Sequence, residues 1–509
     1  MQPVISGNKK YLLIVYLASW LGLFGFSVAR YMPILRGQCP FQTIGWLACS
    51  GQLTNGARFG IGFLYVAVFS IFLLAARWIW KNYNEINNVP VWVKRSLFVL
   101  GVLAVFVVPF SANDLPYYFS AGETVDKGIN LYVADWIHHV DFASPVAVHP
   151  LIGFSYGPLI AIGFAWLYRL SGGQVLIFMF LWKLFMLLTM ILCGALTMKL
   201  VKLFSNNQEG SMWVFWLAQP LLLFEWVVNG HFDGLWLLFL LLAIYAVKKD
   251  KWWLVLPTLA VGMWIKYIPV LLAPFFLLWW WQRLDRQNWK KLTIEMGVGA
   301  VLAVLITIFS WRPFWTGPQV FSSVVVQSKW AVNSVFATLY YALQPLSEKV
   351  FGAQAHFYLT RLTQGILLLA LVYMLYPFIK KGLNILLKRA QWEDGEYVQA
   401  MLIFLLVYLI VWQKSFWPWY GTWFISLGLI AYYAKRNPIL FKIIAWMSAI
   451  PFIQHIILLT DSIAGDPKAG STLWFYASVT LTVLAYPLYL LFRWRQKNYS
   501  TTETIETKF

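Results

Sequence analysis

The chain has 509 residues, of which 60% are hydrophobic and 12% charged, and its mean hydropathy is +0.66. Soluble domains carry about 25% charged residues, so this composition excludes a water-soluble globular protein. The net charge of +19 does not indicate a nucleic-acid-binding protein, because the Lys and Arg residues lie in short clusters beside apolar runs instead of forming one basic surface.

Apolar runs close to the roughly 20 residues that span a bilayer recur from 11–29 to 473–492. Lipid offers the backbone no hydrogen-bonding partner, so these runs must be helices. We predict an all-α polytopic membrane protein with about 12 to 14 transmembrane helices, whose extracytoplasmic loops bear short helices. The first run is predicted to be a spanning helix and not a signal peptide, because Arg30 and Arg36 follow it without a cleavage pattern.

The clusters of Lys and Arg predict which loops stay in the cytoplasm. They lie at 9–10, 81, 94–95, 248–251, 283–291, 380–389, 435–436 and 493–497. The loops 111–156, 229–233, 311–360, 413–420 and 461–471 are then extracytoplasmic. The chain divides into N-terminal transmembrane helices (1–110), an acidic extracytoplasmic loop (111–156), a transmembrane core (157–310), an extracytoplasmic loop (311–360), and C-terminal transmembrane helices with a short cytoplasmic tail (361–509).

Two apolar stretches depart from the pattern of simple spans. The run 159–168 is too short to cross the bilayer and is predicted to be re-entrant or interfacial. The stretch 252–281 is interrupted by Lys266 and Pro269, which favours two short helices that meet at the outer surface.

The three cysteines carry little information about function. Cys193 lies in an apolar run, whereas Cys39 and Cys49 share one loop and could form a disulfide if that loop is extracytoplasmic. The disulfide and the reduced pair are both left open.

The loop 111–156 is acidic in an otherwise basic protein, with five Asp or Glu residues and Lys127 as its only Lys or Arg. Asp114 follows the end of an apolar run at Phe110, and Pro116 stiffens the chain after it. A carboxylate fixed at a helix end near the membrane surface is well placed to act as a general base. The alternative is a solvated loop acid without a catalytic role.

Three ionisable residues lie close together inside apolar sequence at Glu225, His231 and Asp233. Ionisable groups at membrane depth are costly and usually functional. The spacing of His231 and Asp233 does not place them on one helix face, so the sequence favours a hydrogen-bonded cluster over a zinc site. We therefore predict no metal ligands.

Lys266 interrupts an apolar stretch at its predicted outer end and is the best single candidate for contact with an anionic headgroup. The topology puts Arg312, Lys329 and Lys414 on the same side. Several of these cations around one departing phosphate would stabilise its charge. The alternative for each is snorkelling to phospholipid headgroups.

Motifs of nucleotide-driven pumps and of common membrane hydrolases are absent from the sequence: it contains no Walker loop, dinucleotide fingerprint, HExxH or GxSxG. An enzyme whose acidic face looks away from the cytoplasm has no ready access to nucleotide sugars. Its substrate would have to cross the membrane on a lipid.

Six weak motifs follow one another in a fixed order along the chain. They are Asp114 with Tyr117 and Tyr118, Gly128-Ile-Asn-Leu-Tyr132, Tyr156-Gly-Pro-Leu159, Pro220 with Glu225 and Asn229–Asp233, Lys266 with Pro269, and Pro418-Trp-Tyr420. In this order the chain resembles the GT-C glycosyltransferases, and most closely their bacterial polyprenyl-phosphate-mannose-dependent mannosyltransferase branch. Asn113-Asp114 stands where others in that superfamily have two adjacent acids, which leaves one candidate base.

The resemblance implies a GT-C fold and an inverting transfer of a sugar, mannose in that branch, from a polyprenyl-phosphate donor to a glycolipid or polysaccharide acceptor. Asp114 would deprotonate the acceptor hydroxyl, and Lys266, helped by Arg312, Lys329 or Lys414, would hold the phosphate. The implied substrate-binding residues also include Tyr117, Tyr118, Tyr156, Glu225, His231, Asp233, Tyr267, Trp417 and Tyr420. No cofactor is implied, and a requirement for a divalent metal is left open.

The implied location is a bacterial plasma membrane with the active site facing outward, among membrane lipids and without a nucleic-acid partner. A flippase or transporter of lipid-linked sugars is the main alternative, since it too needs many helices and buried charges. It predicts charged residues along a path through the membrane, whereas the candidates here collect on one predicted face. A non-catalytic assembly partner would tolerate loss of Asp114.

Overall fold

The chain forms two compact units. The computed structural model describes residues 7–35, 55–81, 91–109, 114–132, 154–205, 216, 218–284, 288–327, 331, 333–435, 437–454 and 477–506. Unit 1 comprises Met1–Ala273 and Asp285–Ser328, and unit 2 comprises Pro274–Leu284 and Lys329–Phe509.

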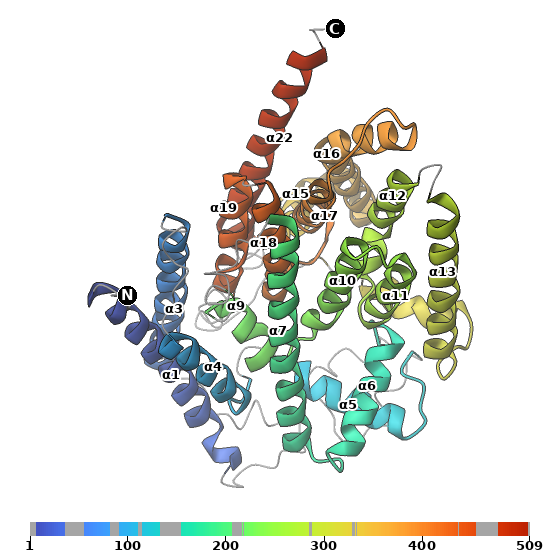
Figure 1. The fold of residues 1–509 in the computed structure, drawn as a ribbon. Helices are drawn as coiled ribbons and strands as arrows, with labels where there is room; N and C mark the ends of the chain where they lie inside the picture. Colours follow the sequence, from blue (N-terminus) through green and yellow to red (C-terminus); the bar gives the residue numbers. More distant parts are fainter. Residues whose placement is uncertain are drawn as a thin grey trace. The chain divides into compact units, whose positions relative to one another are not determined.

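Among the described residues, unit 1 contains the eleven α-helices from α1 to α14, and α12 belongs to unit 2 (Figure 1). They are α1 (Gly7–Leu35), α3 (Asn55–Lys81), α4 (Val91–Val105), α5 (Asp114–Asp126), α6 (Pro158–Leu170), α7 (Val175–Ser205), α9 (Pro220–Leu222), α10 (Asp233–Lys248), α11 (Val255–Ile265), α13 (Trp289–Trp311) and α14 (Ser322–Gln327). A π-helix, η4 (Leu223–Val228), and the 3-10 turns η5 (Trp252–Leu254), η6 (Ile268–Leu272) and η7 (Pro318–Phe321) connect them.

Unit 2 begins within α12 (Ala273–Arg283) and continues through the C-terminal helices. These are α15 (Val335–Phe351), α16 (Ala355–Leu386), α17 (Asp394–Val407), α18 (Trp423–Lys435), α19 (Pro438–Met447) and α22 (Ala485–Glu506). Between them lie the 3-10 turns η8 (Gly352–Gln354), η10 (Pro418–Thr422) and η11 (Ile450–Phe452) and the π-helices η9 (Tyr408–Trp412) and η12 (Thr480–Leu484). No strand occurs in either unit among the residues that the structure describes.

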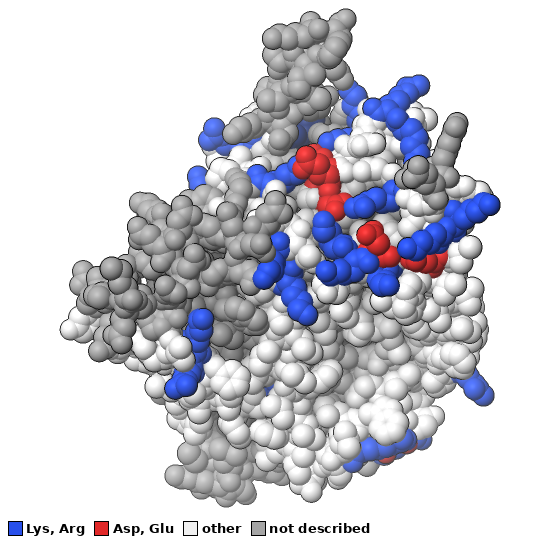
Figure 2. Space-filling model, viewed as in Figure 1, with Lys and Arg blue, Asp and Glu red and all other residues white. Residues whose placement is uncertain are grey.

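The prediction of an all-α polytopic membrane protein is confirmed. Within the described ranges, 5 helices are long and apolar enough to cross a membrane, or up to 6 if the bent pair of Pro220–Val228 and Asp233–Lys248 is one span. Shorter apolar helices accompany them, and Figure 2 shows a broad area of surface without charged side chains. The total of about 12 to 14 spans stays a prediction.

The two irregular apolar stretches form short helices. The first is α6, with 13 residues, which is shorter than the roughly 20 residues of a full span. The second breaks into α11 and α12, because the helix stops at Lys266, whose backbone is extended, before the turn η6 begins. The prediction of two short helices there is confirmed, whereas Cys39 and Cys49 lie outside the described residues.

In unit 1, a series of neighbouring helices positions the site. Helix α5 packs against α6 and α7, α7 packs against α10, and α11 lies between α10 and α13 (Figure 1). Aromatic rings fill the junction: Tyr118 stacks on Phe164 at 4.7 Å between ring centroids and meets Phe232 edge-on at 5.3 Å. Offset and edge-on ring pairs stabilise such a core beyond simple burial.

In unit 2, ion pairs gather three basic clusters at the start of α17. Arg283 pairs with Asp394 at 2.8 Å, and Lys381 and Lys435 pair with Glu396 and Glu393 at 2.9 and 2.7 Å. Carboxylates in the first turn of a helix also interact favourably with its dipole. The three predicted cytoplasmic clusters therefore share one end of unit 2.

Candidate active site

Asp114 is the first residue of α5, whereas the sequence placed it in a loop. The backbone N–H groups at a helix N-terminus favour a carboxylate there, which explains why the helix can begin at an aspartate. The side chain is 23% exposed, so it combines a fixed position with access from outside the core.

A sharp turn brings a second carboxylate and a histidine toward Asp114. The helix axis changes direction by 117° between Pro220–Val228 and Asp233–Lys248. Glu225 lies in the π-helix before the bend and is fully buried. Its backbone carbonyl accepts a hydrogen bond from the His231 N–H at 2.8 Å, which closes the turn. Single π-helical turns occur frequently at functional sites.

Gly230 makes this turn possible. Its φ of +78° lies in the left-handed region, which residues with a Cβ adopt at a cost. A Cβ there would lie 2.6 Å from the nearest Leu115 methyl group, so α5 could not approach as closely. The Gly230 carbonyl accepts a hydrogen bond from Trp182 Nε1 at 2.7 Å. Gly230 therefore sets the distance between the turn and Asp114.

His231 bridges two carboxylates. Its Nε2 lies 2.8 Å from Asp114 Oδ2, and its Nδ1 lies 2.9 Å from Glu225 Oε2. Asn229 Nδ2 donates to the same Glu225 oxygen at 3.0 Å. Ionised carboxylates only accept hydrogen bonds, so an imidazole that carries both protons satisfies both contacts.

The electrostatics agree with a protonated ring. Burial by itself would lower the pKa of His231, but the hydrogen bonds and negative charges of Asp114 and Glu225 raise it to about 9. At neutral pH the His231 ring is therefore an imidazolium that lies between the two carboxyl groups. We call Glu225, His231 and Asp114 the carboxylate–histidine chain.

A second ion pair lies two residues farther along. Lys266 Nζ donates to Asp233 Oδ1 at 2.7 Å, and Asp233 is the first residue of α10. The Lys266 ammonium also lies 5.8 Å from the centroid of the Phe232 ring, within the range of a cation–π contact. The ammonium is thus held by an adjacent carboxylate, beside the turn that carries His231.

Tyrosines lie around the two ion pairs. Burial first, and then the charges of Asp114 and Asp233, raise the pKa of Tyr118 far above its usual value, so its hydroxyl stays protonated. The backbone carbonyl of Tyr156 accepts hydrogen bonds from the hydroxyls of Tyr132 and Tyr267, at 2.9 and 3.2 Å. Tyr117 stacks on Phe154 with 6.0 Å between ring centroids.

The other predicted cations and aromatics lie elsewhere in the chain. Arg312 is exposed just after the end of α13. Lys329 lies outside the described residues. Lys414, Trp417 and Tyr420 are half-buried in unit 2, so their convergence with Lys266 on one phosphate stays a prediction.

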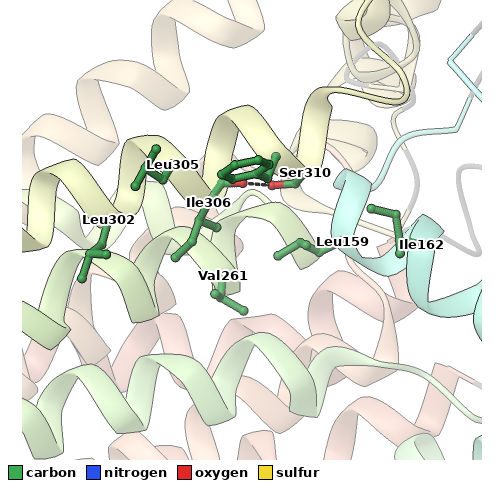
Figure 3. A pocket seen from close by; sticks show the side chains of 8 residues that line it. Leu159, Ile162, Val261, Leu302, Leu305, Ile306 and Ser310 are labelled. Atoms are coloured by element: carbon green, nitrogen blue, oxygen red, sulfur yellow. Dashed lines mark hydrogen bonds between the residues drawn. The ribbon is translucent and has the colours of Figure 1, made fainter.

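An apolar groove runs between α6, α11 and α13 (Figure 3). Its volume is 380 Å³, and its lining residues are Leu159, Ile162, Val261, Leu302, Leu305, Ile306, Phe309 and Ser310. Two residues before the lining residue Leu159, the Gly157 N–H donates to the Ile265 carbonyl at 3.3 Å, one residue before Lys266. Gly157 and the Trp264 backbone approach so closely that a Cβ has no room between them.

Sequence reasoning missed two residues that hold the site in place. Trp182 anchors the Gly230 carbonyl, and Lys183 donates to the Val107 carbonyl in the segment that leads to α5. A buried lysine in the middle of the apolar helix α7 was the available signal, since charges at membrane depth are rarely without a role. Among the described residues, no group of three or more His, Cys, Asp or Glu could hold a metal ion.

A family model described as "Alpha-(1->6)-mannopyranosyltransferase, N-terminal domain" matches residues 19–283, just over half of the chain. The matched range contains all of the carboxylate–histidine chain and the Asp233–Lys266 pair. No curated protein matches the chain.

Proposed function

The chain belongs to the alpha-(1->6)-mannopyranosyltransferase family, and from this membership we propose that it transfers mannose from a polyprenyl-phosphate donor to a glycolipid or polysaccharide acceptor. The reaction would take place at the extracytoplasmic face of a bacterial plasma membrane. The observation that carries the proposal is the placement of Asp114, a fixed and partly exposed carboxylate at the start of α5, inside the range that matches the family.

Asp114 acts as the general base in this proposal. It takes the proton of an acceptor hydroxyl, whose oxygen attacks the anomeric carbon while the bond from that carbon to the phosphate oxygen breaks. The products are the new glycoside and polyprenyl phosphate. The family name points to the 6-hydroxyl of a hexose as the acceptor group and to an α product. An in-line attack inverts the anomeric carbon, so the donor must carry its mannose in the β configuration.

Lys266 meets the donor phosphate. The Asp233 contact holds the ammonium beside Phe232, where an ordered cation can stabilise the charge that grows on the leaving phosphate. No step of this scheme requires a metal ion, and a divalent-metal requirement is a separate question that EDTA can answer. Arg312, Lys329 and Lys414 stay candidates for further phosphate contacts.

The apolar groove takes the first isoprene units of the donor. Its position in the chain supports this, because the lining residues Leu159 and Val261 lie two and four residues from Gly157 and Ile265, whose backbones are hydrogen-bonded one residue before Lys266. Helix α13 is a candidate membrane span with only 17% of its apolar window buried, so the groove opens toward lipid. A chain in the groove would therefore bring its phosphate toward Lys266.

The test is transfer of radiolabelled mannose in membranes that carry the wild-type chain or Asp114→Asn, with a panel of polyprenyl-phosphate sugars. A general base commonly supplies about 10² to 10⁴ in rate, so Asp114→Asn should lose transfer by that factor. Asp126→Asn is the matched control, because Asp126 lies at the other end of α5 and pairs with Arg169. Each assay is repeated with EDTA.

A metal-independent transferase with Asp114 as its base predicts that transfer is lost in Asp114→Asn but not in Asp126→Asn. It also predicts that EDTA leaves the wild-type transfer unchanged. Equal transfer in wild type and Asp114→Asn would remove Asp114 from the mechanism. Absence of transfer from every donor would favour the flippase, which moves lipid-linked sugars without chemistry.

A further inference from the structure

The carboxylate–histidine chain leads from a fully buried group to a partly exposed one. Glu225 has no exposed surface, the His231 side chain is 2% exposed and the Asp114 side chain is 23% exposed. The three groups come from η4, the turn after it, and α5, and both hydrogen bonds of the ring are short enough to fix its orientation. Such an ordered series is costly to bury, so a role is to be expected.

We propose that His231 is a positioning residue, kept as an imidazolium by Glu225, which binds one oxygen of Asp114 and presents the other to the acceptor hydroxyl. This inference rests on the proposed function, in which Asp114 is the base. Neither His231 nor Glu225 exchanges a proton with substrate in this arrangement. The proton from the acceptor stays on Asp114, which remains hydrogen-bonded to the ring.

The geometry accounts for each member of the series. A hydrogen bond from Nε2 to Oδ2 restricts rotation of the Asp114 carboxylate, and a displacement of about 1 Å can cost about 10² in rate. A buried imidazolium needs a compensating negative charge, which Glu225 supplies from the other side of the ring. Asn229 in turn orients the Glu225 carboxylate at 3.0 Å.

Other titratable groups near the ring come from the elements packed around it. Helix α5 contributes Tyr117 and Tyr118, α10 contributes Asp233 with its partner Lys266, and α7 contributes Lys183 next to Trp182. Burial raises the pKa of both Tyr117 and Tyr118 well above that of His231, so these two tyrosines should lose their protons at a higher pH.

The pH profile of kcat distinguishes positioning by an imidazolium from a purely structural contact. Because the pKa of His231 is raised, the imidazolium is present at lower pH and is lost as the pH rises through about 9. The wild-type kcat should fall over that range. In Glu225→Gln the side chain keeps its shape, but one of the two negative charges that raise the pKa of His231 is gone. The fall of kcat should therefore move to lower pH by about 1 to 3 units.

Glu123→Gln is the matched control, since Glu123 is also a buried glutamate of unit 1 but pairs with Lys127 at 2.8 Å. It lies nine residues after Asp114, about 13 Å along α5, so its profile should match the wild type. In His231→Gln, kcat should fall about 10²-fold while KM for the donor changes little. Thermal unfolding in detergent checks that each variant is folded.

The proposal is overturned if the alkaline fall is unchanged in folded Glu225→Gln, or if His231→Gln keeps wild-type kcat. Should neither variant fold, a wild-type kcat that stays constant well above pH 9, with the protein intact, overturns it as well. Asp114→Asn separates this result from a failure of the proposed function. If that variant is inactive while Glu225→Gln has a wild-type profile, only the role of His231 is wrong.

Discussion

At the scale of single residues, the site depends on how closely α5 approaches the turn at 229–232. Gly230 lies at that contact with a positive φ, and Leu115 occupies the space that a Cβ would need. Two costs are therefore combined at one position: the left-handed backbone and the missing space. The hydrogen bond between Asp114 and His231 spans the same contact, so an error at Gly230 is transmitted to the proposed base.

Gly230→Ala is expected to lower both stability and activity. The left-handed backbone alone costs about 1–2 kcal/mol in a residue with a Cβ, and the clash with Leu115 adds to it. Gly128→Ala is a matched control, because Gly128 has a φ of +75° with nothing within 4 Å of an added Cβ. Thermal unfolding and mannose transfer should both fall farther in Gly230→Ala. Equal losses in the two variants would show that the contact with Leu115 is unimportant.

The sequence could nominate the residues of the site but not their partners. Asp114, His231 and Lys266 stand out because each is ionisable beside or within apolar sequence. The contact between His231 and Asp114 joins positions 117 residues apart, so it depends on how helices pack and leaves no trace in local spacing. Trp182 was missed for the same reason, since a tryptophan in an apolar helix is ordinarily a packing residue.

At the scale of elements, the local sequence predicted where a helix is interrupted, but it did not predict where α5 begins or that η4 is a π-helix. Lys266 and Pro269 announced the break between α11 and α12, since proline removes a backbone donor. The start of α5 at Asp114 was hidden, because Pro116 two residues later resembles a loop signal although proline is tolerated in the first turn of a helix. The π-helix η4 has no pattern of its own in the sequence, so its effect on Glu225 appears only in the structure.

The groove between α6, α11 and α13 gives a prediction about how the isoprenoid chain of the donor binds. Val261→Trp should fill part of the groove and displace about two methylene groups of the donor's isoprenoid chain. The lost burial weakens donor binding by about 1.5 kcal/mol, so KM for a long-chain donor should rise about tenfold. KM for a short-chain donor analogue, which does not reach the groove, should stay at its wild-type value. KM for both donors is measured in detergent.

Val301→Trp is the control for this substitution. Val301 lies on α13 at 61% exposure and does not line the groove, so the same change of residue there should leave KM unaltered. A rise in KM that is equal for long and short donors, or equal in the two variants, would mean that the isoprene units bind elsewhere.

At the scale of the whole molecule, composition settled the class of protein, while the number of spans and the arrangement of the two units depend on more than hydropathy. Of the short apolar helices, α11 is mostly buried whereas α6 exposes Trp166 and Leu170, so a length criterion does not tell a core helix from a span. The basic clusters were more informative. Arg283, Lys381 and Lys435 come together around α17, as expected for clusters on one side of a membrane.

The proposed orientation can be tested within unit 1. Helix α10 begins at Asp233 beside the site and has 16 residues, which gives a length of about 24 Å, close to the hydrocarbon thickness of about 30 Å. Lys127, just after α5, and Lys251, just after α10, are both exposed and should lie on opposite sides of the bilayer. An outward site requires Lys127 to be accessible from outside the cell.

A membrane-impermeant maleimide applied to intact cells should therefore label Lys127→Cys but not Lys251→Cys, and both should react after lysis. Cys39, Cys49 and Cys193 must first be replaced by serine or alanine, and mannose transfer by that parent shows that the fold survives. Labelling of Lys251→Cys alone before lysis would invert the topology. The site at Asp114 would then face nucleotide sugars, and the argument for a lipid-linked donor would lose its basis.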